Sequence, residues 1–278
     1  MDTAFFNGEK YMVPHPGHTY SVPCPSPELI KYWLTAVDAH SLHFPFIFKF
    51  YNEVIAGKSD KKKFTGITKL REALANNQSI IQVNDLGAGS KLVNKEQRTV
   101  TQIFRSATSD AKLSMLLYRI CKHIEARNIL ELGTSLGITT EYSALIGSEI
   151  TIYTIEGSDE IQKMAKNHLD SYGNVRFFVG NIDALLPNIL SQMPYVDLAY
   201  IDANNTFEAT LDYCRQIMAK RIPSTVIVVR DIHWSDGMEK AWVELKAFDE
   251  VTLSLDLFEC GILFFMPTKY KQEYAIRF

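Results

Sequence analysis

The stretch NILELGTSLGITT, residues 128–140, decides the fold that this sequence predicts. A short apolar run of β-type residues ends at Glu131, and a helical pattern begins a few residues later. Between them lie the small residues Gly133, Ser135 and Gly137. This order predicts a strand, a tight turn and a helix N-terminus, where backbone N–H groups point at a ligand that lies close to the chain.

A second β-type run, ITIYTIEG at residues 150–157, carries another carboxylate near its end, Glu156. In a βαβ unit, an acid at the tip of the second strand is where the ribose hydroxyls of a nucleotide are held. Glu156 follows Glu131 by 25 residues, the length of one such unit. The pair of acids therefore predicts a site for a nucleoside cofactor.

From residue 128 onward, strand-like and helix-like segments alternate. The strand-like runs are NILEL, ITIYTIE, VRFFVG, VDLAYID and STVIVVRD. This alternation predicts an α/β fold, a doubly wound Rossmann-like sheet that is mostly parallel and covered by helices on both faces. The alternation ends in VTLSLDLF and ILFFM, two runs separated by Glu-Cys-Gly, which predict an antiparallel C-terminal hairpin at the sheet edge.

The first part of the chain has a different character. Residues 1–25 are rich in proline and glycine, and helical patterns follow in SPELIKYWLTAVDAH and PFIFKFYNEVI. We therefore divide the chain into an N-terminal arm and helical extension, residues 1–105, on the acceptor side of the site, and a cofactor-binding domain, residues 106–278. The aromatic residues at positions 44–51 are expected to pack on the core or to line the acceptor pocket.

Composition narrows the partners that we expect. The net charge of −3 provides no field that favours nucleic acid or an anionic membrane, so neither is an expected partner. The four cysteines lie far apart and show no CxxC spacing, which favours reduced thiols and a cytoplasmic location. No apolar run has transmembrane length, and the N-terminus lacks the pattern of a secretory signal.

A second glycine-rich segment, DLGAGS at residues 85–90, competes with the Glu131 loop. It keeps a middle glycine and follows the β-type run SIIQV. However, the residues that follow it show no clear return to a second strand. At the proper distance there is also no second strand that ends in an acid. Since that context separates true cofactor loops from chance glycine patterns, the Glu131 loop is favoured. We interpret residues 85–90 as a turn or as a loop that folds over the active site.

The residues around the favoured loop also narrow the cofactor. The sequence contains no GxxxxGK[ST], which excludes a P-loop NTPase. Gly133 and Gly137 are spaced G-x-x-x-G, unlike the G-x-G-x-x-G of NAD sites, and the charge of Glu131 would repel a pyrophosphate. S-Adenosylmethionine carries an ammonium, a sulfonium and no phosphate. The loop therefore indicates a methyl donor.

Four motifs in order, ELGTSLG, TIEG, VGNIDALLP and VDLAYIDANNTFEA, make residues 106–266 resemble class I S-adenosylmethionine-dependent methyltransferases. The resemblance is greatest to the catechol and caffeoyl-CoA type of small-molecule O-methyltransferase. It implies that the first loop lines the methionine part of the donor, that Glu156 holds the ribose and that the segment after VRFFVG borders the adenine. The implied donor-site residues are Glu131, Gly133, Thr134, Ser135, Gly137, Glu156, Asn181, Ile182, Asp183 and Asp202. Ser135 stands where many members have glycine.

The resemblance also suggests an acceptor site. Asp202 and Asp231 match two aspartates of the metal-dependent branch, in which a divalent cation such as Mg²⁺ lowers the pKa of the acceptor hydroxyl. The asparagine expected after the second aspartate is Ile232, so this ligand set is incomplete. Asp231 also has a purely structural interpretation, as a cap of the following helix. His233 has three open interpretations: a general base, a replacement metal ligand or a histidine that packs beside Trp234.

We therefore expect methyl transfer from S-adenosylmethionine to an oxygen of a small molecule, with Asp202, Asp231 and His233 as the catalytic candidates. One alternative is an NAD-dependent oxidoreductase on a related fold, which the glycine spacing and Glu131 disfavour. Another is a non-catalytic interaction module, which the incomplete metal set supports. A homodimer is compatible with the sequence.

Overall fold

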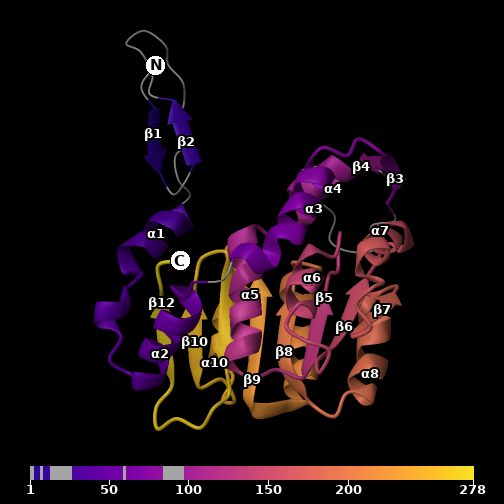
Figure 1. The fold of residues 1–278 in the computed structure, drawn as a ribbon. Coiled ribbons are helices and arrows are strands. Elements are labelled where there is room, and N and C mark those ends of the chain that lie inside the picture. Colours follow the sequence, from indigo (N-terminus) through magenta and orange to yellow (C-terminus); the bar gives the residue numbers. More distant parts are fainter. Residues whose placement is uncertain (1–2, 7–8, 13–26, 59–60, 84–96) are drawn as a thin grey trace. The chain divides into compact units, whose positions relative to one another are not determined.

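The computed structural model describes residues 3–6, 9–12, 27–58, 61–83 and 97–278. The chain divides into two compact units, residues 1–35 and residues 36–278. The first unit contains the antiparallel strands β1 (Thr3–Phe6) and β2 (Glu9–Met12) and the helix α1 (Pro27–Thr35). The second unit contains all other elements (Figure 1).

The second unit is built on an eight-stranded sheet with the order β12-β10-β11-β9-β8-β5-β6-β7. Its strands are β5 (Asn128–Leu132), β6 (Thr151–Glu156), β7 (Val175–Val179), β8 (Val196–Ile201), β9 (Arg221–Arg230), β10 (Leu253–Asp256), β11 (Cys260–Phe264) and β12 (Gln272–Ala275). Strands β5 to β9 pair in parallel, which confirms the Rossmann-like prediction. Because β5 lies between β6 and β8, the strand order reverses beside β5, and ligands of open α/β sheets bind at such a switch point.

The C-terminal strands complete the sheet. Strands β10 and β11 form the predicted antiparallel hairpin, and β11 pairs antiparallel with β9. Strand β12 pairs in parallel with β10 and lies beyond the hairpin at the sheet edge. The sequence did not predict β12, because QEYA is short and polar and lacks the alternation of a half-buried strand.

Helices cover both faces of the sheet (Figure 1). The covering helices are α2 (Pro45–Phe50), α5 (Ala111–His123), α6 (Ile138–Ala144), α7 (Asp159–Leu169), α8 (Ile182–Gln192), α9 (Phe207–Met218) and α10 (Asp236–Ala247). Helices α3 (Thr65–Ala75) and α4 (Val100–Ala107) pack on each other and on other helices, not on the eight-stranded sheet. Short helical segments lie at Ala39–Ser41, Tyr51–Ile55 and Lys61–Phe64, and a two-stranded sheet joins β3 (Ile80–Gln82) to β4 (Gln97–Thr99). Helices α2 and α5 share one apolar core with the sheet, and α8, α9 and α10 share the other.

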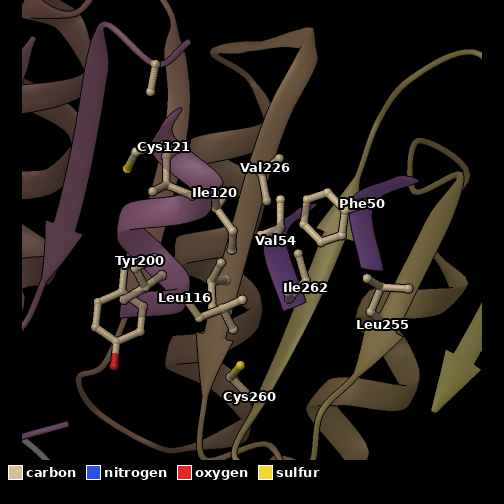
Figure 2. Close-up of a cluster of buried hydrophobic side chains, with 14 of the residues drawn as sticks. Phe50, Val54, Leu116, Ile120, Cys121, Tyr200, Val226, Leu255, Cys260 and Ile262 are labelled. Carbon is tan, nitrogen blue, oxygen red and sulfur yellow. The ribbon is translucent and has the colours of Figure 1, made fainter. Parts of the chain in front are cut away.

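The aromatic segment at residues 44–51 belongs to the first of these cores. Phe50 is fully buried, and its ring lies edge-on to Phe264 of β11 with the centroids 5.1 Å apart. Phe46 contacts the same ring, whereas Phe48 is 48% exposed. Figure 2 shows Phe50 and Val54 beside strand residues of the sheet. The core interpretation is confirmed for Phe46 and Phe50. The functional division at residue 105 stays a prediction.

Two features that the sequence singled out lie outside the described residues, namely the 85–90 loop and Cys24. The other three cysteines, Cys121, Cys214 and Cys260, are buried and free. Within the described ranges, no helix combines the length and the apolarity that a membrane crossing requires.

Candidate active site

The predicted site residues lie along one edge of the sheet. Gly133, Glu156, Asp202 and Asp231 stand at or just after the carboxyl ends of β5, β6, β8 and β9. Since these strands are parallel neighbours, those ends share one edge, and it is the edge at which α/β folds bind ligands. Backbone hydrogen bonds join the loops: the Gly133 N–H donates to the Ile155 carbonyl at 2.9 Å, and the Asp202 N–H donates to the Leu132 carbonyl at 2.9 Å.

The loop after β5 requires its glycines. Gly133 has φ = +97° and Gly137 has φ = +75°, which are left-handed conformations that residues with a Cβ rarely adopt. A Cβ on Gly133 would lie 2.2 Å from the carbonyl oxygen of Asp202. A Cβ on Gly137 would lie 2.7 Å from Leu169 Cδ1 of α7. The glycines therefore allow the loop to approach β8 and α7 closely as well as to turn.

Ser135 is held between these two glycines. Its φ is +47°, and its N–H donates to Glu156 Oε2 at 2.8 Å. Its hydroxyl is buried and has no hydrogen-bond partner among the described residues. Because buried polar atoms are nearly always paired in folded proteins, this hydroxyl fits a site that a polar ligand completes. Thr134, beside it, is buried and pairs through its own hydroxyl with Thr154 at 2.6 Å.

Glu156 joins the loops that follow β5 and β6. Its Oε2 accepts the Ser135 N–H, and its Oε1 accepts the Ser158 N–H at 3.0 Å. The side chain is partly buried, and these two contacts fix its direction. A carboxylate has about four acceptor positions, so the two oxygens have capacity for the hydroxyls of a ribose as well.

Glu131 lies beneath the loop. It is 3% exposed, and its Oε2 accepts hydrogen bonds from the hydroxyls of Thr140 and Thr154, both at 2.6 Å. Burial raises the pKa of Glu131 to about 7, the nearby charges of Asp202 and Glu156 add to this, and the two threonines oppose it. A small internal cavity beside the carboxylate is also lined by Leu117, Thr139, Ser143 and Tyr200. Direct contact between Glu131 and a donor stays a prediction.

The three predicted adenine-site residues lie at the start of α8. Asn181 caps this helix by accepting the Asp183 N–H at 2.7 Å, and Ile182 is buried. Asp183 Oδ1 accepts the Tyr213 hydroxyl at 2.5 Å, and that hydroxyl accepts a hydrogen bond from Asn204 at 2.6 Å. Asn181 and Asp183 are exposed, so a ligand at the sheet edge could reach their side chains.

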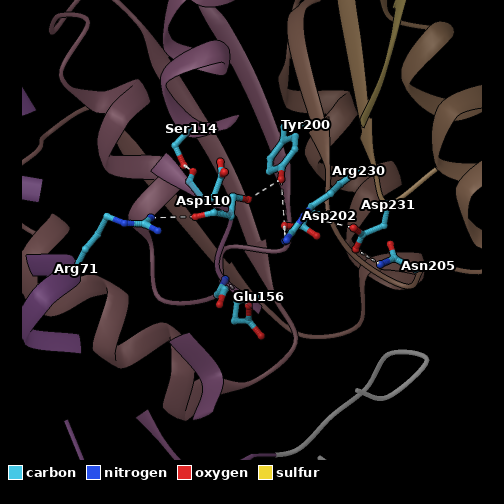
Figure 3. Close-up of polar contacts among 11 residues, drawn as sticks. Arg71, Asp110, Ser114, Glu156, Tyr200, Asp202, Asn205, Arg230 and Asp231 are labelled. Carbon is cyan, nitrogen blue, oxygen red and sulfur yellow. Dashed lines mark hydrogen bonds and ion pairs between the residues drawn. The ribbon is translucent and has the colours of Figure 1, made fainter. Parts of the chain in front are cut away.

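Asp202 and Asp231, which the sequence predicts on the acceptor side, are joined by an arginine that sequence reasoning missed (Figure 3). Arg230, the last residue of β9, donates from Nη1 to Asp202 Oδ2 at 2.8 Å. Its Nε lies 3.6 Å from Asp231 Oδ1. The Tyr200 hydroxyl donates to Asp202 Oδ2 at 3.1 Å, and Asn205 donates to Asp231 Oδ2 at 3.0 Å. The available signal was a charged residue directly after the apolar run VIVV at the end of the strand.

The environment of this cluster shifts its ionisation. Burial raises the pKa of Asp231 to about 6, with a contribution from Asp202, while Arg230 and Asn205 oppose the shift. Burial alone would lower the pKa of Arg230, but Asp202, Tyr200 and Asp231 outweigh burial and raise it. Asp231 also has φ = +57°, a strained conformation of the kind that concentrates at functional sites.

His233 is enclosed by acidic side chains. Its Nδ1 pairs with Glu239 of α10, and its Nε2 lies 2.9 Å from Asp256 Oδ2 of β10. The ring stacks on Phe258 with the centroids 5.1 Å apart. Burial would lower its pKa, but the two carboxylates outweigh burial and raise it. With both ring nitrogens engaged, the geometry fits the packed, hydrogen-bonded interpretation. The base and metal-ligand roles stay predictions.

The side chains at this edge do not fit a divalent cation. Among the described residues, no group of three or more His, Cys, Asp or Glu side chains is placed to hold a metal ion. Ile232, in the position of the expected asparagine, is fully buried and has no donor atom in its side chain. Asp202 and Asp231 both form ion pairs with the guanidinium of Arg230.

Comparison with known proteins agrees with this description. Residues 130–232 match a family model described as a methyltransferase domain. A comparison with curated protein sequences gives no match. Several solved structures share the fold, each with a sequence identity too low to indicate more than the fold.

The O-methyltransferase TomG from Streptomyces achromogenes, solved with S-adenosylmethionine, is 20% identical, with a TM-score of 0.52 over 60% of this chain and 87% of that chain. An O-methyltransferase from Bacillus cereus, solved with S-adenosylhomocysteine, is 18% identical, with a TM-score of 0.51 over 78% of this chain and 96% of that chain. The Podospora anserina methyltransferase PaMTH1 is 14% identical, with a TM-score of 0.51 over 76% of this chain and 98% of that chain. Residues 130–232 are therefore similar to a methyltransferase domain, and the sheet to which they belong has the Rossmann-like fold.

Proposed function

We propose that the chain is an S-adenosylmethionine-dependent methyltransferase that methylates an oxygen of a small molecule. The observation that carries the proposal is the methyltransferase-domain match, because it covers the glycine loop and the ends of β6, β8 and β9. Fold neighbours that were solved with S-adenosylmethionine or S-adenosylhomocysteine support the donor. Two of those neighbours are O-methyltransferases, which supports an oxygen acceptor.

The donor site follows from the geometry of the loops. Gly133 to Gly137 would border the methionine part, with the unpaired Ser135 hydroxyl as one polar contact. Glu156 would hold the ribose hydroxyls, since its carboxylate is fixed by two backbone N–H groups. The exposed side chains at the start of α8, Asn181 and Asp183, would border the adenine together with Ile182.

The reaction is a direct displacement at the sulfonium, in which a bond forms between the acceptor oxygen and the methyl carbon while the carbon–sulfur bond breaks. The protein must hold the two reactants in line and accept the proton of the acceptor hydroxyl. We propose Asp231 for that proton, because its pKa of about 6 leaves it mostly ionised at neutral pH and still basic enough to act. Asp202 would orient the acceptor. His233 could act as the base only by leaving Asp256 or Glu239.

Binding of S-adenosylhomocysteine tests the donor site. We expect calorimetry to show one site per chain, and Glu156→Ala to weaken binding about 100-fold, since two hydrogen bonds to a charged group would be lost. Glu160→Ala, an exposed acid on α7, removes the same charge and should leave the affinity unchanged. A folded Glu156→Ala protein, with an unchanged melting curve and unchanged affinity, would contradict the ribose assignment. A parallel titration with NAD(H) should give no heat of binding.

Turnover tests the acceptor class. Labelled S-adenosylmethionine is supplied with a panel of phenols, carboxylates and amines. We expect label in phenols or carboxylates. Label in amines alone would contradict the oxygen acceptor, and no label despite tight donor binding would favour the non-catalytic interpretation.

A further inference from the structure

Arg230 occupies the space between the two acceptor-side carboxylates. Its Nη1 is 2.8 Å from Asp202 Oδ2, and its Nε is 3.6 Å from Asp231 Oδ1. All three side chains are largely shielded from solvent, with exposed fractions of 19% for Arg230, 13% for Asp202 and 27% for Asp231. One fixed positive charge therefore faces both acids.

Neutral side chains hold the acids on their other sides. Asp202 Oδ2 accepts both the Tyr200 hydroxyl and Arg230, and the Tyr200 hydroxyl lies 2.8 Å from the Ser109 hydroxyl. Asp231 Oδ2 accepts a hydrogen bond from Asn205. One oxygen of Asp202 and both oxygens of Asp231 therefore already face donors, and a divalent cation would have to compete with these donors. A cation placed among them would also lie close to the guanidinium and be repelled by it.

We propose that Arg230 is the built-in cation of this site, that it excludes divalent metal and that it supplies the positive charge for the acceptor oxygen. The second part rests on the proposed function; the exclusion of metal does not. An arginine suits this role because its guanidinium stays charged at every physiological pH and binds carboxylates in a fixed planar geometry.

The same geometry would allow Arg230 to stabilise the acceptor oxygen during catalysis. A guanidinium has five N–H donors, more than its two aspartate contacts use. Held in place by the two acids, it would present a donor to the acceptor oxygen without reorganising as negative charge develops there. The net charge of the three side chains is −1 with Arg230 and −2 without it, so a polar substitution would leave two neighbouring acids uncompensated.

Manganese binding tests the exclusion without knowledge of the acceptor. Mn²⁺ is titrated into the full chain, and free Mn²⁺ is followed by electron paramagnetic resonance. We expect no stoichiometric site in the wild type. We expect the Arg230→Gln protein to bind Mn²⁺ at least about tenfold more tightly than the wild type does. The guanidinium that repels the cation is then gone, and two acids are left without a compensating charge. Arg230→Gln combined with Asp202→Asn should lose that site again. Arg221→Gln, on the same strand but bonded to the Met218 carbonyl, is the matched control and should bind no Mn²⁺.

Two results would overturn the exclusion. One is a wild-type chain that binds one equivalent of Mn²⁺ and loses it on Asp202→Asn. The other is a folded Arg230→Gln protein with no gain in Mn²⁺ binding, which would show that Arg230 is not what keeps the metal away. Far-UV circular dichroism and the melting curve, measured in parallel, confirm that each variant is folded. Failure of the wild type to bind S-adenosylhomocysteine would count against the proposed function alone.

Turnover tests the catalytic part with any acceptor that the labelled panel yields. We expect wild-type turnover to be unchanged by EDTA, and Arg230→Gln to lower kcat about 100-fold with donor affinity retained. Loss of wild-type activity in EDTA and its recovery with Mg²⁺ would overturn the proposal.

Discussion

Single residues at this site serve packing and chemistry together. Gly133 adopts a left-handed conformation, and it also lies against the backbone of the loop that carries Asp202. Gly133, which turns the loop after β5, thus also sets the distance from that loop to Asp202. A side chain at this position would separate β5 from β8 at their carboxyl ends.

We expect Gly133→Ala to lower the free energy of unfolding by about 3 kcal/mol or more, because an alanine there is strained and its Cβ would lie 2.2 Å from the Asp202 carbonyl oxygen. Gly66→Ala is the control. Gly66 lies in α3 with no atom within 4 Å of an added Cβ, so that variant should be neutral or up to about 1 kcal/mol more stable. Urea denaturation measures both. Equal stabilities would contradict the close approach of the loop.

At the scale of elements, helix α2 is an integral part of the second unit. Its Phe50 and the following Val54 and Ile55 share a core with α5 and with strands of the sheet. The solvent-facing side of α2 carries Phe48 and Lys49, which are exposed. A segment that precedes the methyltransferase-domain match in the chain therefore stabilises the sheet on which the site is built.

Phe50→Ala should destabilise the protein by about 3–5 kcal/mol, since it removes a fully buried ring that contacts Phe264 and His123. Phe48→Ala removes the same group from the same helix at an exposed position, so we expect a change of about 0.5 kcal/mol. Thermal and urea unfolding compare the two variants. A Phe50→Ala protein as stable as Phe48→Ala would mean that α2 does not pack on the sheet.

At the scale of the whole molecule, buried ionisable groups couple folding to pH. Glu131 is the clearest case, because its pKa of about 7 in the folded chain exceeds the ordinary value of 4.5. The folded chain holds this proton over a range in which the unfolded chain has lost it. The contribution of Glu131 to stability is therefore fully present below pH 4.5 and is lost as the pH rises through about 7.

Between pH 5 and pH 8, the free energy of unfolding of the wild type should fall by about 3 kcal/mol more than that of Glu131→Gln. Glutamine keeps an oxygen for Thr140 and Thr154 but has no proton to release. The pKa of His233 is also raised, so His233 makes the free energy of unfolding fall with pH in both proteins. The difference between the two curves of unfolding free energy against pH therefore reports on Glu131 alone. Glu208→Gln, at an exposed position, should reproduce the wild-type curve. Parallel curves for Glu131→Gln and wild type would refute the assignment.

The sequence by itself determined the alternation of strands and helices after residue 128, the turn at Gly133 to Gly137 and the place of Glu156 at a strand end. It could do so because periodicity and turn chemistry act between residues that are close in the chain. It also predicted the resemblance to methyltransferases that the family model matches over residues 130–232. Only the tertiary structure decided which side chains meet. Arg230 lies between Asp202 and Asp231, His233 pairs with Asp256 of β10, and Glu131 is turned beneath its own loop toward Thr140 and Thr154. These contacts depend on strand register and helix packing, which bring distant residues together and which no local pattern encodes.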